Sequence, residues 1–279
     1  MKDTVTAAPP PTAEMATAAR FTWCAGQLVS ASTPVRQPLI ADSWLLDNGR
    51  VRGLAIHERR FSEACTRLLP DLDGSVVRAF LSAVRLKLPR TGCWFPRIEA
   101  QRGQLAVWLR SAPPRTEYTT LWIAPGSDPR SSPQIKGPDL AILGELRERA
   151  RRQGADDALL CAADGSVLET AHSSLVWWRK DVLCVPTAES SILPSVTRRL
   201  LLELVQHSGV AVIRERMRPV ELAAVETWTL NALHGIRPVS NWLGLDGAGE
   251  AGPPVGSRFR EWATALDELM TSVDHLPAE

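Results

Sequence analysis

The chain has 279 residues, 44% of them hydrophobic, which is enough for one large domain or two moderate ones around a substantial core. Lys and Arg number 32 against 31 Asp and Glu, so the formal charge of +1 gives no electrostatic reason to expect a nucleic-acid or membrane partner. No stretch approaches the ~18 apolar residues of a membrane span, so we expect a soluble protein. We further expect that it is cytoplasmic, acts on a small molecule and holds no metal.

The first part of the chain mixes strand and helix patterns. Residues 1–20 are rich in Ala, Thr and Pro and are expected to form a disordered tail. Short apolar runs then alternate with turn signals, which predicts strands joined by hairpins, among them 21–26 and 43–46. Apolar residues at helical spacing predict helices at 56–69 and 75–86. We therefore expect a small α+β domain over 21–125. The five cysteines of the chain are widely spaced and are expected to be buried free thiols.

The second part is predicted to be strand-rich. Pro, Gly and Ser accumulate between 124 and 132, which predicts an interdomain linker at 126–132. Pro138 at a first helical position and Gly154 as a C-terminal cap predict a helix that starts immediately after Lys136. A larger domain over 133–270 and a flexible tail over 271–279 are expected. The other elements predicted in the larger domain are strands at 158–161, 167–170, 175–178, 182–185, 210–214 and 227–230, and a helix at 197–207.

Three motifs in this second part suggest a pyridoxal phosphate (PLP) site. Lys136, one of only four lysines, could supply an amine for a Schiff base, and Glu169 a carboxylate for a pyridinium nitrogen. The run 192–198, Ile-Leu-Pro-Ser-Val-Thr-Arg, could supply free amides for a phosphate. Singly, each has an ordinary structural explanation: a surface lysine, a strand-edge carboxylate and a capped helix start. Their joint order favours the cofactor site.

Five blocks of sequence, including these three, resemble the class IV (fold type IV) PLP enzymes. That family includes branched-chain aminotransferases, D-amino acid aminotransferases and 4-amino-4-deoxychorismate lyases. The resemblance extends from about Phe21 to Trp242. It implies an α+β fold of two domains, a smaller N-terminal and a larger strand-rich C-terminal one, with PLP in the cleft between them, and usually a homodimer. The blocks are His57-Glu58-Arg59-Arg60-Phe61, Lys136, the Asp-Gly-x-x-x-Glu that ends at Glu169, the run 192–198, and the run 231–239 (Asn-Ala-Leu-His-Gly-Ile-Arg-Pro-Val).

The resemblance also implies a role for each matching residue. Lys136 would be the Schiff-base lysine and the general base, and Glu169 the partner of the pyridine nitrogen. Arg60 would bind the phosphate, whereas Arg59 would face solvent. The remaining cofactor contacts would be the backbone amides of Val196 and Thr197 at a helix start and a second turn at Asn231 and Ala232.

Three positions depart from the family pattern. Ser195 replaces the usual glycine of Leu-Pro-Gly, so the phosphate turn must avoid a positive φ or accept strain. Gly137-Pro138 follows Lys136 where many relatives carry other residues. Ala141 occupies the position at which aminotransferases often have a tyrosine, and the chain has a single tyrosine, Tyr118. The missing tyrosine argues against an ordinary branched-chain aminotransferase.

The reaction is left open between two chemistries of this family. Asn231-Ala232-Leu233 resembles the lyase subgroup, which favours 4-amino-4-deoxychorismate lyase over an aminotransferase. A third possibility is a non-catalytic descendant that keeps the fold as a binding module. A dicarboxylate substrate needs cationic partners, although a surface salt bridge would explain any one of the candidates equally well. The substrate candidates are Arg97, Arg102, Leu233, His234 and Arg237.

Overall fold

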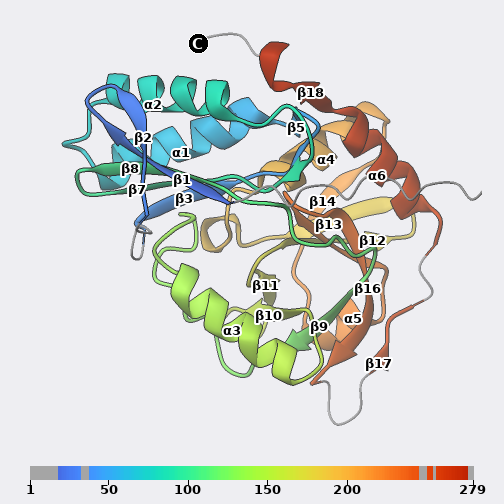
Figure 1. The fold of residues 1–279 in the computed structure, drawn as a ribbon. Coiled ribbons are helices and arrows are strands. Elements are labelled where there is room, and N and C mark those ends of the chain that lie inside the picture. Colours follow the sequence, from blue (N-terminus) through green and yellow to red (C-terminus); the bar gives the residue numbers. More distant parts are fainter. Residues whose placement is uncertain (1–17, 33–37, 245–249, 254–255, 276–279) are drawn as a thin grey trace, which may run out of the picture.

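A computed structural model describes residues 18–32, 38–244, 250–253 and 256–275. The smaller, N-terminal part is a five-stranded antiparallel sheet in the order β2-β1-β8-β7-β3. Helices α1 (Leu54–Leu68) and α2 (Gly74–Lys87) lie on one side of this sheet (Figure 1). Its strands are β1 (Ala19–Cys24), β2 (Gln27–Ser30), β3 (Ile40–Ser43), β7 (Arg97–Gln101) and β8 (Gln104–Leu109).

The larger part is built on a nine-stranded sheet of mixed direction. Its order is β11-β10-β9-β16-β15-β12-β13-β14, and β17 pairs with β16. Helices α4 (Val196–His207) and α6 (Arg258–Glu268) pack on one face, while α3 (Leu140–Arg152) packs near β9 and β10. The strands are β9 (Thr119–Ile123), β10 (Asp157–Cys161), β11 (Val167–Thr170), β12 (Ser174–Arg179), β13 (Val182–Pro186), β14 (Val212–Glu215), β15 (Thr227–Asn231), β16 (Gly235–Leu243) and β17 (Glu250–Ala251).

A small third sheet connects the two parts. Its order is β18-β5-β4-β6, and β18 (Met270–Ser272), near the end of the described chain, pairs with β5 (Arg50–Arg52). Val273, directly after β18, is buried in the N-terminal core. The tail expected over 271–279 is therefore ordered as far as His275, because β5 offers a strand edge to it. The sheet is completed by β4 (Leu46–Asp47) and β6 (Cys93–Trp94), and the short helices are α5 (Pro219–Ala223), η1 (Glu189–Ser191) and η2 (Val273–His275).

Most predicted elements are present, and the differences have local causes. The strand predicted at 43–46 is divided, because Ser43 ends β3 and Leu46 begins β4. The helix after Lys136 begins at Leu140, two residues after the predicted first position at Pro138, since Pro138 lies in a turn. The segment 126–132 lies between β9 and α3, and β9 already belongs to the larger sheet. The tail predicted over 1–20 lies outside the described residues except for 18–20, and β1 begins within it at Ala19.

The fold confirms the α+β class, with a smaller part and a strand-rich larger one. Three of the five free cysteines are buried as expected, whereas Cys24 and Cys93 are exposed. Among the described helices, none is both long enough and apolar enough to cross a membrane.

Candidate functional site

Lys136 lies in the loop between β9 and α3, where that loop touches the edge of the N-terminal sheet. Its carbonyl oxygen accepts a hydrogen bond of 2.7 Å from the amide of Ala41 in β3. A Cβ atom on Gly137 would lie 2.2 Å from the carbonyl oxygen of Leu39. Only glycine allows this close backbone approach, which explains the departure from the family pattern at position 137.

The Lys136 amine is surrounded by charges from both parts of the chain. Burial and the charge of Arg60 lower the pKa of Lys136 to about 8, whereas Asp42 and Glu169 act in the opposite direction. Arg97 lowers the same pKa further. A half-buried lysine in this setting has a sizeable neutral fraction near pH 8, and the neutral amine is the form that acts as a nucleophile or a base.

Arg60 extends from α1 and is held by a buried carboxylate that the sequence did not reveal. Its Nε and Nη2 atoms each lie 2.8 Å from an oxygen of Asp42, and its Nη1 donates to the carbonyl of Pro194 at 2.8 Å. His57 Nδ1 lies 2.8 Å from the same carboxylate. Although burial acts against it, the pKa of Asp42 is held well below its usual range by Arg60 and His57. A guanidinium carries five N–H groups, and two of those of Arg60 have no acceptor among the residues that the structure describes.

Glu169, in β11, is 3% exposed and uses one of its two oxygens. Oε1 accepts from the amide of Leu193 at 2.8 Å and from Nη1 of Arg130. Oε2 accepts no hydrogen bond from the described residues. Burial raises the pKa of Glu169, and Arg130 opposes this shift. Arg130 is a second residue that the sequence did not reveal, and it also contacts Asp128.

The start of α4 presents amides next to Arg60. A helix leaves its first N–H groups without intrahelical acceptors, and here these groups include the amides of Val196 and Thr197, both buried residues. Ser195 has φ −74° and ψ 127°, and its side chain accepts from the amide of Arg198 at 3.2 Å. The serine therefore avoids a positive φ, so this turn does not need the family's glycine.

The β15–β16 hairpin is held in shape by Asn231. Its Nδ2 donates to Ser173 Oγ at 2.9 Å, and its Oδ1 accepts from the amides of Leu233 at 3.0 Å and His234 at 2.8 Å. Ala232 and Leu233 are half-buried. Burial, together with Arg237 and other arginines, lowers the pKa of His234 to about 4. His234 is therefore neutral at pH 7 and differs from the cationic partner expected for a carboxylate.

The predicted arginines occupy different places. Arg97, on β7, acts electrostatically on Lys136. Arg237 is 4% exposed and donates to Thr116 Oγ1 at 3.0 Å. Arg102 lies exposed in the turn between β7 and β8. The structure thus brings together Lys136, Glu169, Arg60 and Arg97, and it leaves Arg102 on the surface.

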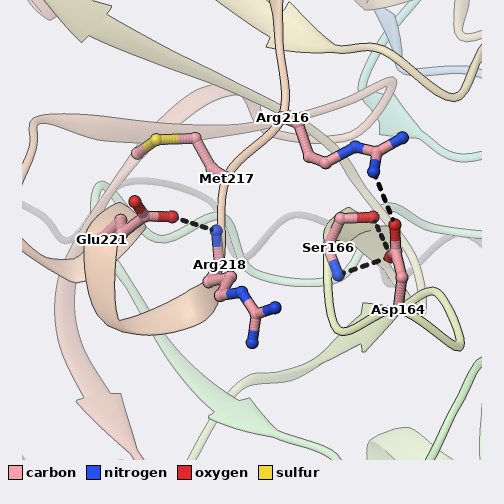
Figure 2. Close-up of a pocket in the computed structure, with 6 residues that line it drawn as sticks. All are labelled: Asp164, Ser166, Arg216, Met217, Arg218 and Glu221. Atoms are coloured by element: carbon pink, nitrogen blue, oxygen red, sulfur yellow. Dashed lines mark hydrogen bonds and ion pairs between the residues drawn. The ribbon is translucent and has the colours of Figure 1, made fainter.

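A separate surface pocket is visible beside the β10–β11 hairpin (Figure 2). Its polar groups pair with one another: Arg216 with Asp164 at 3.0 Å, and the carboxylate of Glu221 with the amide of Arg218 at 2.7 Å. Ser166 also donates twice to Asp164. None of the predicted site residues lines this pocket, and its local pairing makes it a structural feature of the hairpin.

Comparisons with known proteins agree with this fold. Over 103 residues the chain is 28% identical to a protein of Rickettsia bellii (strain RML369-C) described as "Probable branched-chain-amino-acid aminotransferase"; the match covers 36% of this chain and 35% of that protein. The chain thus spans about a third of the length of the curated relative it matches.

Solved structures resemble the fold over most of the chain. A hypothetical aminotransferase from Mycobacterium tuberculosis in PLP-bound form has a TM-score of 0.72 at 18% identity, covering 91% of this chain and 99% of that one. A Legionella pneumophila protein described as "Putative 4-amino-4-deoxychorismate lyase" has a TM-score of 0.69 at 17% identity, covering 85% and 96%. Residues 39–242 match the family model for amino-transferase class IV. The chain therefore belongs to the class IV aminotransferase family.

Proposed function

We propose that this chain binds pyridoxal 5′-phosphate through Lys136 and acts as a 4-amino-4-deoxychorismate lyase, which yields p-aminobenzoate and pyruvate. The observation that carries the proposal is the grouping of a lysine whose pKa is lowered to about 8 with Arg60 and Glu169. A surface lysine would have no such surroundings.

The donors and acceptors of this site fit the cofactor. Glu169 Oε2 has no donor among the described residues, so it is free to accept from a pyridine N–H. Arg60 donates from Nη1 to the carbonyl of Pro194, just before α4, so its guanidinium lies next to the first amides of that helix. Those amides, of Val196 and Thr197, favour an anion such as phosphate. Asn231 and Ala232 would add the second turn on the phosphate side. Bound PLP supplies a ring that accepts electrons from the substrate carbon next to the amine.

Each residue then has a task that its surroundings support. Lys136 would hold the cofactor covalently and, once released, would take the proton from that carbon as a general base. Loss of the enolpyruvyl group, which takes up a proton to become pyruvate, then leaves the ring aromatic. Glu169 stays paired with Arg130, which favours the ionised carboxylate and thereby a protonated ring nitrogen. Asp42 orients Arg60 by two hydrogen bonds. Of the substrate candidates, Arg97 is the one whose charge acts on Lys136.

Lyase chemistry is supported by two features, and an aminotransferase is the alternative. The Asn231-Ala232-Leu233 turn resembles that of the lyases, and Asn231 fixes it by three hydrogen bonds. Ala141, in place of a tyrosine, is exposed on α3. The Rickettsia bellii relative favours the aminotransferase. A non-catalytic binding module is a third possibility, but it would have no physical need for Lys136, Glu169 and Arg60 together.

One experiment tests both levels of the proposal. Borohydride reduction of the PLP-treated protein, followed by peptide mass spectrometry, should place a pyridoxyl group on Lys136 and not on the exposed Lys180. Incubation with aminodeoxychorismate should release pyruvate, and Lys136→Ala should do neither. Labelling of Lys136 together with amino-group transfer, but without pyruvate release, would establish the aminotransferase. Labelling of Lys136 with neither amino-group transfer nor pyruvate release would leave the binding module. Absence of labelling would remove the cofactor assignment.

The homodimer that the resemblance implies, with one subunit closing the other's pocket, and the cytoplasmic location remain predictions. The molar mass of the protein, measured by light scattering after size-exclusion chromatography, tests the homodimer.

A further inference from the structure

Asp157 is a buried carboxylate that the proposed site does not use. It lies at the start of β10 and is 2% exposed. Burial acts to raise the pKa of Asp157, but the hydrogen bonds and charge of His172 and the hydroxyl of Thr170 outweigh it, so the pKa lies below its usual value. A buried charge is costly unless donors compensate it. The groups that donate to Asp157 therefore indicate what its charge holds in place.

The turn between β11 and β12 surrounds this carboxylate. Thr170 Oγ1 donates to Asp157 Oδ2 at 2.7 Å, and the amide of His172 donates to the same oxygen at 3.2 Å. The His172 ring lies close as well, with Nδ1 3.6 Å from Asp157 Oδ1. Thr170 Oγ1 in turn accepts from the amide of Ser173 at 2.9 Å. Asp157 thus fixes the shape of the turn over 170–173.

The turn 170–173 is joined to the β15–β16 hairpin. Ser173 Oγ accepts from Nδ2 of Asn231 at 2.9 Å, and Oδ1 of Asn231 accepts from the amides of Leu233 and His234. The hydrogen bonds therefore form one connected network, from the buried carboxylate through two side-chain hydroxyls to the amides at the tip of the hairpin. Groups in such a network support one another, so removing one member weakens the rest.

The same carboxylate also acts on the returning strand of the hairpin. Asp157 of β10 pairs with Leu121 of β9, and Val239 of β16 pairs with Thr119. Residues two apart on a strand share a face, so the side chains of Asp157 and Arg237 lie on one face of the sheet. Burial lowers the pKa of Arg237, and the negative charge of Asp157 opposes this shift. The attraction between the two charges holds β16 from across β9.

The network lies behind two of the proposed cofactor contacts. Glu169 directly precedes Thr170 in β11, and successive residues of a strand point to opposite faces. Glu169 therefore extends from the strand that Thr170 anchors on the other face. Asn231 and Ala232 form the turn proposed for the phosphate side. Asp157 lies on the face opposite Glu169, so its effect on the site is indirect.

We propose that Asp157 is a positioning residue, which acts through the turn 170–173 to hold the tip of the β15–β16 hairpin, residues 231–234, in the shape that binds the cofactor phosphate. The inference rests on the proposed function, because it takes PLP as the ligand. The hold on the hairpin tip is a property of the chain alone, so it can be measured without cofactor.

Replacing Thr170 with valine interrupts the network at nearly constant volume, whereas Thr170→Ser keeps the hydroxyl. In the protein without cofactor, hydrogen–deuterium exchange of the Leu233 and His234 amides should be about 3- to 10-fold faster in Thr170→Val, the range for one lost hydrogen bond. Thr170→Ser should stay close to the wild-type rate. The preference for PLP over pyridoxal, which lacks the phosphate, should fall in Thr170→Val by about the same factor when both are titrated by absorbance.

A matched control separates positioning from a general loss of stability, which would weaken the binding of PLP and pyridoxal alike. Thr227, 2% exposed in β15, donates to the carbonyl of Leu222 at 3.1 Å. Thr227→Val therefore removes another buried hydroxyl from the same hairpin, outside the network. It should leave both the exchange of the hairpin tip and the preference for PLP unchanged.

The outcomes separate this inference from the proposed function. In a wild-type protein that borohydride labels at Lys136, an unchanged exchange rate or an unchanged PLP preference in Thr170→Val, or equal changes in Thr227→Val, would overturn the positioning role and keep the cofactor assignment. A wild type that is not labelled removes the cofactor assignment, and faster exchange in Thr170→Val would then still establish the hold on the hairpin tip. Ser173→Ala serves if Thr170→Val does not fold, because it removes the acceptor of Asn231 and should give the same two changes.

Discussion

Replacing Arg130 with glutamine tests how the protein controls Glu169. The Arg130 side chain is 4% exposed and donates to Glu169, to both oxygens of Asp128 and, at 3.0 Å, to the carbonyl of Ser191. Without it, the carboxylate of Glu169 is buried with the Leu193 amide as its one donor within the described part of the chain. We expect the free energy of unfolding to fall and the pKa of Glu169 to rise further.

The size of the effect follows from the burial of the pair. Removing one partner of a buried ion pair costs about 3–5 kcal/mol, because the other charge is left uncompensated. Glu169→Gln leaves no charge at that position and should cost about 1–3 kcal/mol, as for other losses of a buried charged hydrogen bond. In the double variant, position 169 is uncharged, so Arg130→Gln leaves no unpaired carboxylate there. The double variant should therefore be about 1–3 kcal/mol more stable than the sum of the two single effects predicts.

Urea unfolding of the wild type, both single variants and the double variant measures this coupling. A carboxylate whose folded pKa is raised contributes stability below its unfolded pKa and loses it as the pH rises through the folded pKa. Because Arg130→Gln raises that pKa further, its cost should be larger at pH 7 than at pH 5, and this difference should vanish in the Glu169→Gln background. Additive effects, or a cost that does not change with pH, would refute the control of Glu169 by Arg130.

Three further outcomes are expected. In the protein without cofactor, acetylation of Lys136 should rise with pH around a midpoint of about 8, because the neutral amine reacts; peptide mass spectrometry measures it, with exposed Lys180 as the internal reference. Gly137→Ala should destabilise by about 1–3 kcal/mol or more through the clash with Leu39, whereas Gly144→Ala, with open space around its Cβ in α3, should stabilise by about 0.5–1 kcal/mol; thermal unfolding compares them. Ser195→Ala should cost about 1 kcal/mol in urea unfolding and Ser195→Gly only a few tenths, because the hydroxyl caps α4 and the backbone needs no glycine.

Helix positions were predictable from sequence wherever apolar spacing decided them. The helices predicted at 56–69, 75–86 and 197–207 lie within two residues of α1, α2 and α4, since their buried faces carry that spacing. The start of α3 was not predictable from the sequence. Asp139 accepts hydrogen bonds from the amides of Ser131 and Ser132 and so organises the loop that precedes the helix. Pro138 belongs to that loop. The preference of proline for the first position of a helix therefore gave the wrong start for α3.

The site was predictable only where its residues belong to sequence motifs. Lys136, Glu169 and Arg60 were predicted in this way, and in the structure the charges of Arg60 and Glu169 act on Lys136. Asp42 and Arg130 carry no such signal: Asp42 lies between Ala41 and Ser43 in the short strand β3, and Arg130 lies in a segment predicted as a linker. Their partners lie 18 and 39 positions away. Arg20 in β1 and Arg97 in β7 both pair with Trp108 of β8, and this proximity depends on strand pairing that no local pattern specifies.

The cations around Lys136 also connect substrate binding with the proton on that amine. Arg60 and Arg97 lower the pKa of Lys136, so an anion that neutralises either should raise it from about 8 toward its ordinary value. A higher pKa makes the amine a stronger base. The pKa would rise in this way only when a substrate carboxylate is bound. The acetylation midpoint of Lys136 should accordingly move to higher pH with saturating glutarate. The shift should be smaller in Arg97→Gln, because that variant lacks one of the two cations that the anion would neutralise. An unchanged midpoint in the wild type would mean that the anion binds too far from Lys136 to influence its proton.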